Sequence, residues 1–471
     1  MANKFSEINT RHLSIFLIVL SAILYGIICF YALTKPAILF DDYYTLGIIR
    51  YPFWDMITAT AENVHPPLYY IIFKIFKVLL HPNSNYSLII IGKIVSLVPL
   101  GLLLIFSCTK IRKEFNLLVS GIFCLLLCSS FQIMNYTTVI RMYSWGLFFL
   151  TIQLYYIYDL LKNSNRSWVI FTIATICSCY THYFCAISSI LVYVILLLYF
   201  IRYNRNLIKK WAVSAIFCIL AYLPWLNILI TQISGVRESY WIKPITLEKI
   251  FDYFQFVFSP NNNEIGMIVS IVLLLTIVIV TIMAFKRKNI EFEEKTYIVI
   301  LLSTIFITIL TGIVLSLMIR PIFVERYILP CFGGLWLGFS IVISKFKDDK
   351  KILLILIAFL LVISAIATIG FIDESNANFD DSNKNLNFLN SINENYDFVI
   401  MEDPLTYMRY APFLPNATVI NGDINGTIST NLNQKEIIVF DKLGHVENNT
   451  DFTLIGEIHQ DKVYIFKLEG D

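Results

Sequence analysis

The chain consists of long apolar stretches separated by short polar segments. A membrane-spanning helix needs about 20 mainly apolar residues, and about eleven stretches come near that length. They are residues 12–34, 86–108, 116–133, 142–161, 168–181, 184–201, 211–232, 265–285, 297–318, 327–343 and 352–371. The third, fifth and sixth stretches are the shortest. The pattern predicts a mostly α-helical, polytopic membrane protein with about eleven transmembrane helices.

Basic residues mark one side of this predicted bundle. They follow the second, fourth, sixth, eighth and tenth spans: Lys110, Arg112 and Lys113; Lys162 and Arg166; Arg202, Arg205, Lys209 and Lys210; Lys286, Arg287 and Lys288; Lys345, Lys347, Lys350 and Lys351. Cytoplasmic loops carry an excess of Lys and Arg. Because every second loop is basic, we expect a multi-pass protein of the cytoplasmic membrane with its N-terminus in the cytoplasm and its C-terminus outside.

Three segments on the predicted outer side are too long or too polar to be simple turns. They are residues 35–85, residues 233–264 and the tail that begins at Asp373. Inside the first, residues 67–80 are apolar but too short to cross a membrane. Lys74 and Lys77 lie on one side of this run at helical spacing, which predicts an amphipathic helix in the membrane interface.

The tail differs in composition from the rest of the chain. It is rich in Asn and Asp, and turn-forming residues separate strand-like runs at 397–401, 418–421, 437–441 and 462–468. We therefore expect two domains, a transmembrane domain over residues 1–372 and a small mixed α/β domain outside the membrane over residues 373–471.

Composition agrees with a membrane protein and excludes one class of partner. Hydrophobic residues make up 57% of the chain and charged residues only 15%, whereas soluble domains have about 25% charged residues. The net charge is +2, which argues against nucleic-acid binding. The nine cysteines lie in or beside apolar stretches without a CxxC pattern, and this placement favours packing over a disulfide or metal framework.

An acidic pair, Asp41 and Asp42, follows the first predicted span. Adjacent carboxylates can hold a divalent cation, or one can act as a base while the other binds. The alternative is an ordinary helix cap, because Asp is a favoured residue at the start of a helix. The pair alone does not separate these two interpretations.

The sequence ENVHPPLYY, residues 62–70, closes the first outer loop. Two consecutive prolines end one segment and start the next at a fixed geometry. His65 is therefore held at a rigid corner beside Glu62. A histidine placed in this way is a candidate metal ligand or polar anchor, although single histidines are commonly structural.

Cationic residues lie near the outer ends of several spans. Arg141 and Arg326 occupy positions where the loop rule disfavours positive charge, and Lys93 lies about two turns inside the second span. Charges placed this way are functional candidates, and the guanidinium group suits bidentate binding of phosphate. The alternatives are an ion pair between an arginine and Glu325, and a lysine that reaches toward lipid phosphate.

These motifs together resemble the bacterial branch of the protein O-mannosyltransferase-like glycosyltransferases, which include the aminoarabinose transferase of lipid A. The resemblance rests on the acidic pair after the first span, HPPLYY, the R-M-Y at residues 141–143 and the E-R-Y-x-L-P at residues 325–330, and it covers about residues 10–345. It implies the membrane fold known as GT-C and transfer of a sugar from a polyprenyl-phosphate carrier outside the cytoplasmic membrane.

The resemblance also implies roles for single residues. Asp41 matches the loop acid that serves as base or metal-orienting group, Asp42 stands beside it, and His65 matches the histidine of the family. Arg141, Arg326 and Tyr327 match positions expected to face the carrier phosphate, and Lys93 stands where relatives often carry Arg. Relatives often have Asp where this chain has Asn63. A divalent metal held by Asp41, Asp42, Glu62 and His65 is therefore a hypothesis that the sequence leaves open.

The leading hypothesis is a glycosyltransferase that moves a sugar from a polyprenyl-phosphate-linked donor to a lipid, glycan or protein acceptor. A flippase or transporter of lipid-linked sugars is the first alternative, but most predicted spans are free of Asp and Glu and the polar residues gather on one face. A surface-polysaccharide polymerase or ligase is the second, but residues 233–264 offer few charged groups. The sugar, the acceptor and the stereochemical outcome are left open.

Overall fold

The computed structural model describes most of the chain. The described residues are 10–62, 64–163, 166–238, 242–261, 264–287, 290–430, 436–447, 449–459 and 461–467. They fall into two compact units. The first unit contains residues up to Tyr31, Thr60–Ile72 and Ile94–Asp373, and the second contains Ala32–Ala59, Phe73–Lys93 and Glu374–Asp471. The second unit thus combines the tail with two segments from the beginning of the chain, and the predicted division at residue 372 stays a prediction.

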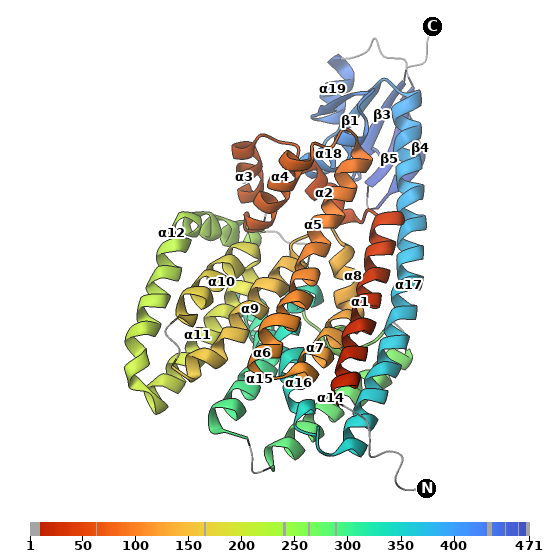
Figure 1. Ribbon diagram of the computed structural model, residues 1–471. Coiled ribbons are helices and arrows are strands. Elements are labelled where there is room, and N and C mark those ends of the chain that lie inside the picture. Colours follow the sequence, from red (N-terminus) through yellow and green to blue (C-terminus); the bar gives the residue numbers. More distant parts are fainter. Residues whose placement is uncertain are drawn as a thin grey trace, which may run out of the picture. The chain divides into compact units, whose positions relative to one another are not determined.

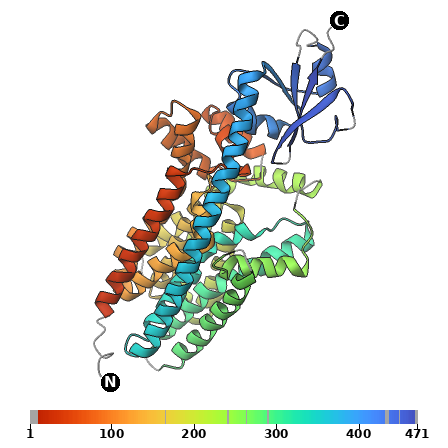
Figure 2. The same cartoon turned by 90° about the vertical axis from the view of Figure 1, so that its right-hand side faces the viewer.

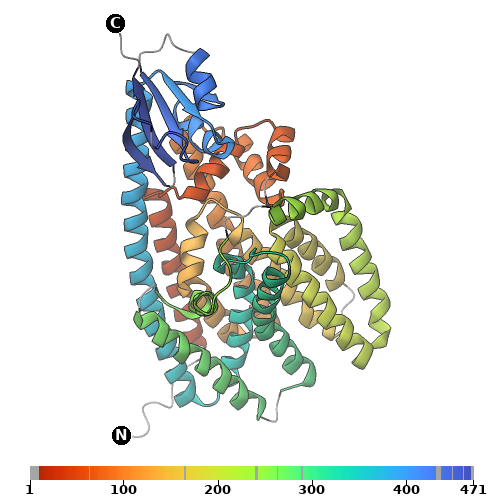
Figure 3. The ribbon, with the colours of Figure 1, turned by 180° about the vertical axis from the view of Figure 1, so that it is seen from behind.

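The first unit is a helical bundle (Figures 1 and 3). The helices wholly inside it are η2 (Ser107–Ile111), α6 (Arg112–Glu114), α7 (Leu117–Ser129), α8 (Phe131–Thr138), α9 (Tyr143–Leu161), α10 (Ser167–Thr181), α11 (Tyr183–Tyr203), η3 (Arg205–Leu207), α12 (Ile208–Glu238), α13 (Leu247–Phe258), α14 (Glu264–Phe285), α15 (Phe292–Met318), η4 (Glu325–Cys331) and α16 (Phe332–Ser344). Five further helices contribute residues to both units: α1 (Thr10–Thr34), α3 (Phe53–Glu62), α4 (Leu68–Leu80), α5 (Asn85–Phe106) and α17 (Lys350–Asn395).

Every predicted span overlaps a helix, but fewer than eleven of the described helices are long and apolar enough to cross a membrane. Among the described residues, 8 helices are long and apolar enough to cross a membrane, or 9 if α7 and α8, which are bent by 63°, form one span. The two other predicted spans that do not pass are α9 and α10, and α10 has only 15 residues. Helix α9 carries Gln153 and Asp159, and most of its residues are buried, so other protein elements rather than lipid surround it. The chain is a multi-pass membrane protein.

Small residues let α9 and α16 approach each other closely. A Cβ atom added to Gly333 of α16 would lie 2.8 Å from Cβ of Thr151 on α9. An atom added to Gly146 of α9 would lie 2.9 Å from Sγ of Cys185 and 3.2 Å from Cγ of Pro330. Close packing of backbones at small residues is the usual basis of helix association in membranes. Gly146 thereby brings the first turn of α9 against the start of α11 and against η4.

The second unit is built around a five-stranded mixed sheet (Figure 2). Its strands are β1 (Phe398–Met401), β2 (Thr418–Asn421), β3 (Glu436–Asp441), β4 (Phe452–Ile458) and β5 (Asp461–Lys467), and its order is β2-β1-β3-β5-β4. Strand β1 pairs in parallel with β2 and β3, and β5 pairs antiparallel with β3 and β4. Helices α2 (Phe40–Ile48), α18 (Pro404–Tyr410) and α19 (Ile424–Thr430) and the short η5 (Ala411–Phe413) complete the unit.

The predicted mixed α/β fold of the tail is confirmed, and four of its strands lie where the sequence pattern placed them. Strand β4 was not predicted; only its two end residues are buried, so it lacks the regular alternation of a half-buried strand. A second finding concerns α17, which continues from the last predicted span to Asn395 without a break. The first part of the expected outer domain is therefore helical.

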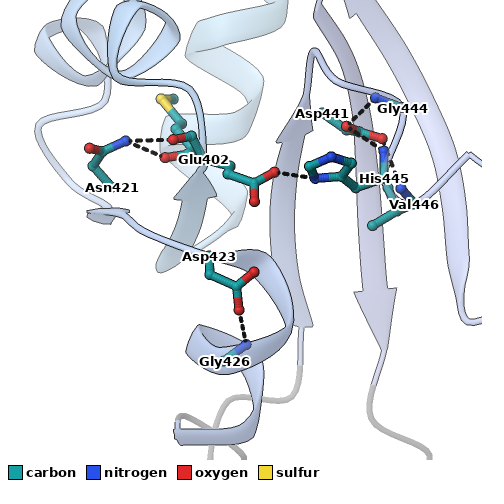
Figure 4. Close-up of polar contacts among 9 residues, drawn as sticks. Glu402, Asn421, Asp423, Gly426, Asp441, Gly444, His445 and Val446 are labelled. Atoms are coloured by element: carbon teal, nitrogen blue, oxygen red, sulfur yellow. Dashed lines mark hydrogen bonds and ion pairs between the residues drawn. The ribbon is translucent and has the colours of Figure 1, made fainter.

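Polar side chains fix the loops at the carboxyl ends of the parallel strands (Figure 4). Both oxygens of Asp441 accept backbone N–H groups, from Gly444 at 2.8 Å, from His445 at 3.1 Å and from Val446 at 3.0 Å. Nδ1 of His445 lies 2.6 Å from Oε2 of Glu402. Gly444 has a φ of 78°, a left-handed conformation that glycine adopts without a steric penalty. This network ties the loop after β1 to the loop after β3.

The predicted helix over residues 67–80 is present as α4 (Leu68–Leu80). In the second unit, Nζ of Lys74 and Nζ of Lys77 both donate to the carbonyl oxygen of Ile49, at 3.2 Å and 3.0 Å. The two lysines therefore lie on one side of α4, as expected, and they bind a carbonyl at the C-terminal end of α2. Val78 and Leu79 are exposed. These apolar side chains fit the predicted place in the membrane interface.

Candidate functional site

Three breaks between helices and one short helix carry a cluster of polar side chains in the first unit. His65 lies between α3 and α4, and Arg141 lies just before α9. His182 separates α10 from α11, and Arg326 lies in the short helix η4. Pro66 and Pro67 end the segment that precedes α4, because proline cannot continue a preceding helix. Residues far apart in the sequence are thereby brought to the ends of neighbouring helices.

Arg141 is the centre of this cluster. Its side chain is 5% exposed. One guanidinium nitrogen donates to the hydroxyl of Tyr70 at 3.1 Å, and the other lies 3.2 Å from Nε2 of His65. The structure thus brings together two residues predicted for the site, Arg141 and His65, through the HPPLYY segment. Tyr70 was not predicted.

The protonation state of the two histidines follows from their hydrogen bonds. An arginine can only donate, so Nε2 of His65 accepts from Arg141 and the proton of the neutral ring lies on Nδ1. Nδ1 of His182 accepts the backbone N–H of Phe184 at 3.1 Å, which places the proton of the neutral ring on Nε2. Burial, followed by the charge of Arg141, holds the pKa of His65 well below its usual value. The ring is therefore neutral at physiological pH.

His182 is also neutral for the same physical reasons. Burial is the larger cause and the charge of Arg326 the next, and together they lower the pKa of His182 to about 3. The ring centroids of His182 and His65 lie 6.1 Å apart. The ring of Tyr327 lies 4.6 Å from that of His182. Two neutral imidazoles therefore stand beside the arginines and add no charge of their own.

Arg326 is half-buried and its Nε donates to the hydroxyl of Tyr143 at 2.8 Å. Its neighbour in the sequence, Glu325, forms an ion pair with Lys249 of α13. Thr246 caps the start of α13 by accepting the backbone N–H of Lys249 at 3.2 Å, which places that lysine in the first turn. The two tyrosine hydroxyls and the imidazole that accept hydrogen bonds from the two arginines are neutral groups.

Two helices begin at the cluster. Helix α9 starts two residues after Arg141, and α11 starts directly after His182. The N-terminus of a helix carries partial positive charge and backbone N–H groups that favour anions. The two guanidinium groups and the two helix ends all attract anions, so this part of the unit suits a phosphate group better than a cation.

The predicted acidic pair lies in the second unit, in the first turn of α2. Asp42 is fully buried, and its Oδ2 lies 3.2 Å from Nζ of Lys93, which is also buried. The same oxygen accepts the backbone N–H of Leu39 at 3.2 Å. Asp42 therefore binds the start of α2 from the third position of the helix, where Leu39 is the N-cap residue, and it also forms a buried ion pair. Asp41 differs, because its side chain is partly exposed.

Several predictions on site residues remain open. Lys93 pairs with Asp42, and its predicted contact with the carrier phosphate stays a prediction, as do the roles of Asp41, Asp42, His65, Arg141, Arg326 and Tyr327. In the described part of the chain, no group of three or more His, Cys, Asp or Glu side chains could hold a metal ion. The metal hypothesis on Asp41, Asp42, Glu62 and His65 stays a prediction. Asn63 lies outside the described residues.

Sequence reasoning missed some members of the first-unit cluster. His182 stands between two short predicted spans, 168–181 and 184–201, and a polar residue at such a break is a usable signal. Tyr70 and Tyr143 lie inside the two motifs HPPLYY and R-M-Y. They were overlooked because tyrosines near the ends of spans are common in membrane interfaces.

Comparison with solved structures defines the fold. ArnT from Cupriavidus metallidurans bound to undecaprenyl phosphate has a TM-score of 0.63 at 10% sequence identity, over 95% of this chain and 97% of that chain. The Archaeoglobus fulgidus oligosaccharyltransferase in complex with Zn and sulfate has a TM-score of 0.53 at 12% identity, over 90% of this chain and 68% of that chain. The same enzyme tethered with an acceptor peptide containing the NVT sequon has a TM-score of 0.51 at 10% identity, over 91% and 69%.

These similarities show that the chain has the GT-C fold, and they confirm the predicted fold class. At such low identity they are evidence for the fold and not for a particular substrate. No family model matches the sequence, and no curated protein matches it. The function is therefore argued from the residues of the site.

Proposed function

We propose that this protein is a membrane glycosyltransferase that moves a sugar from a polyprenyl-phosphate-linked donor to an acceptor on the outer face of the cytoplasmic membrane. The observation that carries the proposal is the cluster of Arg141 and Arg326 with two neutral histidines at the N-termini of α9 and α11. A buried guanidinium group beside a half-buried one, near the ends of helices, suits the phosphate of a lipid carrier, because the tail can stay in the bilayer.

The chemistry assigned to the acidic pair follows from its asymmetry. Asp42 is committed to Lys93 and to the start of α2, whereas Asp41 is partly exposed in the same turn. In the proposed reaction an acceptor oxygen attacks the anomeric carbon of the sugar. The bond between that carbon and the phosphate oxygen breaks, and its electron pair leaves with the phosphate. The carboxylate of Asp41 takes the proton of the acceptor. If a divalent metal binds, Asp41 would help to hold it, and the metal would supply positive charge for the leaving phosphate.

Stabilisation of the leaving phosphate is the role assigned to the cationic cluster. Negative charge grows on the phosphate as the glycosidic bond breaks, and fixed donors aimed at developing charge lower the barrier most. Arg141 is held by Tyr70 and His65, and Arg326 is held by Tyr143. Tyr327 is assigned to the same phosphate site. The aromatic and imidazole contacts keep the guanidinium groups oriented before the donor binds.

Support from the structural neighbours is of a general kind. ArnT from Cupriavidus metallidurans binds undecaprenyl phosphate, and an oligosaccharyltransferase shares the fold. Both are glycosyltransferases of the membrane, which agrees with the proposed reaction class. The donor sugar and the acceptor of this protein are not specified by these similarities.

Removal of either arginine tests the phosphate site. We expect Arg141→Ala or Arg326→Ala to weaken binding of undecaprenyl phosphate by about 10- to 100-fold, since a hydrogen bond to a charged group contributes about 1.5–3 kcal/mol. Binding is measured by titration of the purified protein in lipid nanodiscs. Arg205→Ala is the matched control, because Arg205 is exposed in the loop at η3. Unchanged affinity in both cluster variants, or an equal loss for donor and acceptor, would contradict the phosphate role.

The ion pair between Lys249 and Glu325 provides a second test of the same site. Lys249→Met releases a carboxylate directly beside Arg326, and that carboxylate competes with phosphate for the guanidinium group. We expect donor affinity to fall about tenfold, the equivalent of about 1.4 kcal/mol. The double variant Lys249→Met with Glu325→Gln removes the competing charge, and its affinity should return to within about twofold of the wild-type value. If Glu325→Gln alone is as harmful as Lys249→Met, the pair acts by holding η4 in place instead.

A further inference from the structure

Helix α2, which carries the acidic pair, packs against α18 inside the second unit. The contact is closest at Gly47. A Cβ atom added there would lie 3.1 Å from the carbonyl carbon of Met408 and 3.2 Å from its Cγ. Backbone meets backbone at this point, and only glycine leaves enough space. A helix from the first loop of the chain is thus seated directly on a helix of the tail.

An aromatic junction forms the middle of the same contact. The ring of Tyr43 is fully buried, and its centroid lies 5.5 Å from that of Tyr410, 5.0 Å from that of Phe413 and 5.5 Å from that of His459. The hydroxyl of Tyr410 lies 3.0 Å from Nδ1 of His459. Burial, followed by the charge of Arg409, lowers the pKa of His459 to about 4. The imidazole is therefore neutral, and its Nδ1 forms a hydrogen bond with the Tyr410 hydroxyl.

A cation stacks on the first residue of α2. The guanidinium carbon of Arg409 lies 3.9 Å from the centroid of the Phe40 ring, and the Arg409 side chain is 8% exposed. A buried cation over an aromatic face contributes more than an exposed one. The ring of Phe40 also lies 5.3 Å from that of His459. Arg409 therefore holds the residue that directly precedes Asp41.

The three anchored residues share one face of α2. Phe40, Tyr43 and Gly47 are spaced three and four residues apart, which places them on one side of a helix. Asp41 and Asp42 follow Phe40 by about 100° and 200° around the helix axis, so they lie away from the anchored face. The contact with the tail therefore fixes α2 while leaving the acidic pair on its other sides.

We infer that the α/β part of the tail is a positioning element for α2, and that Gly47, Arg409 and the pair of Tyr410 and His459 act as positioning residues for Asp41. The structural half of this inference, that the tail holds α2 in place, stands without the proposed function. The catalytic half rests on the proposed function, because a base that is held loosely approaches the acceptor in fewer productive orientations. The tail is thereby part of the catalytic apparatus, although none of its residues is assigned to the substrate.

Gly47→Ala and Arg409→Met test the inference in the full-length protein in lipid nanodiscs. Hydrogen exchange of the backbone amides of α2 is the first readout, and we expect exchange at least about tenfold faster in both variants. The second readout is transfer kinetics, where kcat should fall about tenfold or more while the KM for the donor stays within about twofold, since the arginine cluster is untouched. Gly26→Ala on α1 is the matched control, because an added Cβ there meets no atom within 4 Å.

The outcomes separate the inference from the proposed function. Unchanged exchange in α2 in a folded Arg409→Met variant overturns the anchoring, even if Gly47→Ala fails to fold. Faster exchange with unchanged kcat, or a fall in kcat matched by an equal rise in the KM for the donor, overturns the positioning of Asp41. A wild-type protein that transfers no sugar from any polyprenyl-phosphate donor refutes the proposed function, while the exchange measurement still decides whether the tail holds α2.

Discussion

Asp41→Asn is expected to lower sugar transfer about 10³-fold, the middle of the range for loss of a general base. The substitution keeps the size of the side chain and removes its ability to take a proton or to hold a metal. Asp41 is partly exposed, and the buried ion pair of the same helix involves its neighbour Asp42. Because asparagine has the size and shape of aspartate, the variant should insert and fold like the wild-type protein. Transfer is measured with purified protein in vesicles, at matched protein amounts.

Asp55→Asn is the control for this substitution. Asp55 is exposed and lies in the first turn of α3 in the same unit, so the change of charge is the same without the proposed chemistry. Its activity should match that of the wild-type protein. A wild-type rate in the Asp41→Asn variant would rule out Asp41 as the base.

Lys93→Met is expected to have the largest effect on stability. It leaves the carboxylate of Asp42 buried without its cation, and breaking a buried ion pair in this way costs about 3–5 kcal/mol of the free energy of unfolding. Both side chains are almost completely shielded from solvent, 3% exposed for Lys93 and 0% for Asp42. The change is measured by denaturant titration of the purified protein, with the fluorescence of a label in the second unit as the signal.

Two further variants show whether the loss of stability comes from the buried charge. In the double variant Lys93→Met with Asp42→Asn the buried charge is gone, and most of the lost stability should return. Lys384→Met removes a cation from an exposed pair with Asp381, where the expected loss is below about 1 kcal/mol. If Lys93→Met and Lys384→Met have the same small effect, the pair between Lys93 and Asp42 does not stabilise the start of α2.

The sequence predicts much of the fold because hydrophobic length and periodicity are local properties. Each apolar stretch folds as a helix since the bilayer forces its backbone to satisfy its own hydrogen bonds. The same property says less about α9, where Gln153 is tolerated because that part of the helix is buried by protein. It also cannot predict that residues 32–59 and 73–93 join the tail in one unit. That grouping depends on contacts between distant segments, such as Gly47 with Met408.

The candidate site was predictable only in part, for a similar reason. Cations and acids near span ends are visible in the sequence, so Asp41, Arg141 and Arg326 could be named. The neighbouring side chains that decide whether these groups are paired or charged cannot be read from the sequence. Asp42, for example, is paired with Lys93, which lies 51 residues away in the sequence. The neutral state of His65 depends on its burial beside Arg141, which the fold alone provides.

The most direct test of the proposed function follows the sugar and the polyprenyl phosphate of the donor in the same experiment. Purified protein in sealed vesicles is given a panel of polyprenyl-phosphate-linked sugars together with lipid, glycan and peptide acceptors. The expected result is release of free polyprenyl phosphate with the sugar recovered on one acceptor class, and loss of this release in Asp41→Asn. Movement of the intact donor across the bilayer, with its glycosidic bond unbroken in the presence of every acceptor, would contradict glycosyl transfer and would identify a flippase instead.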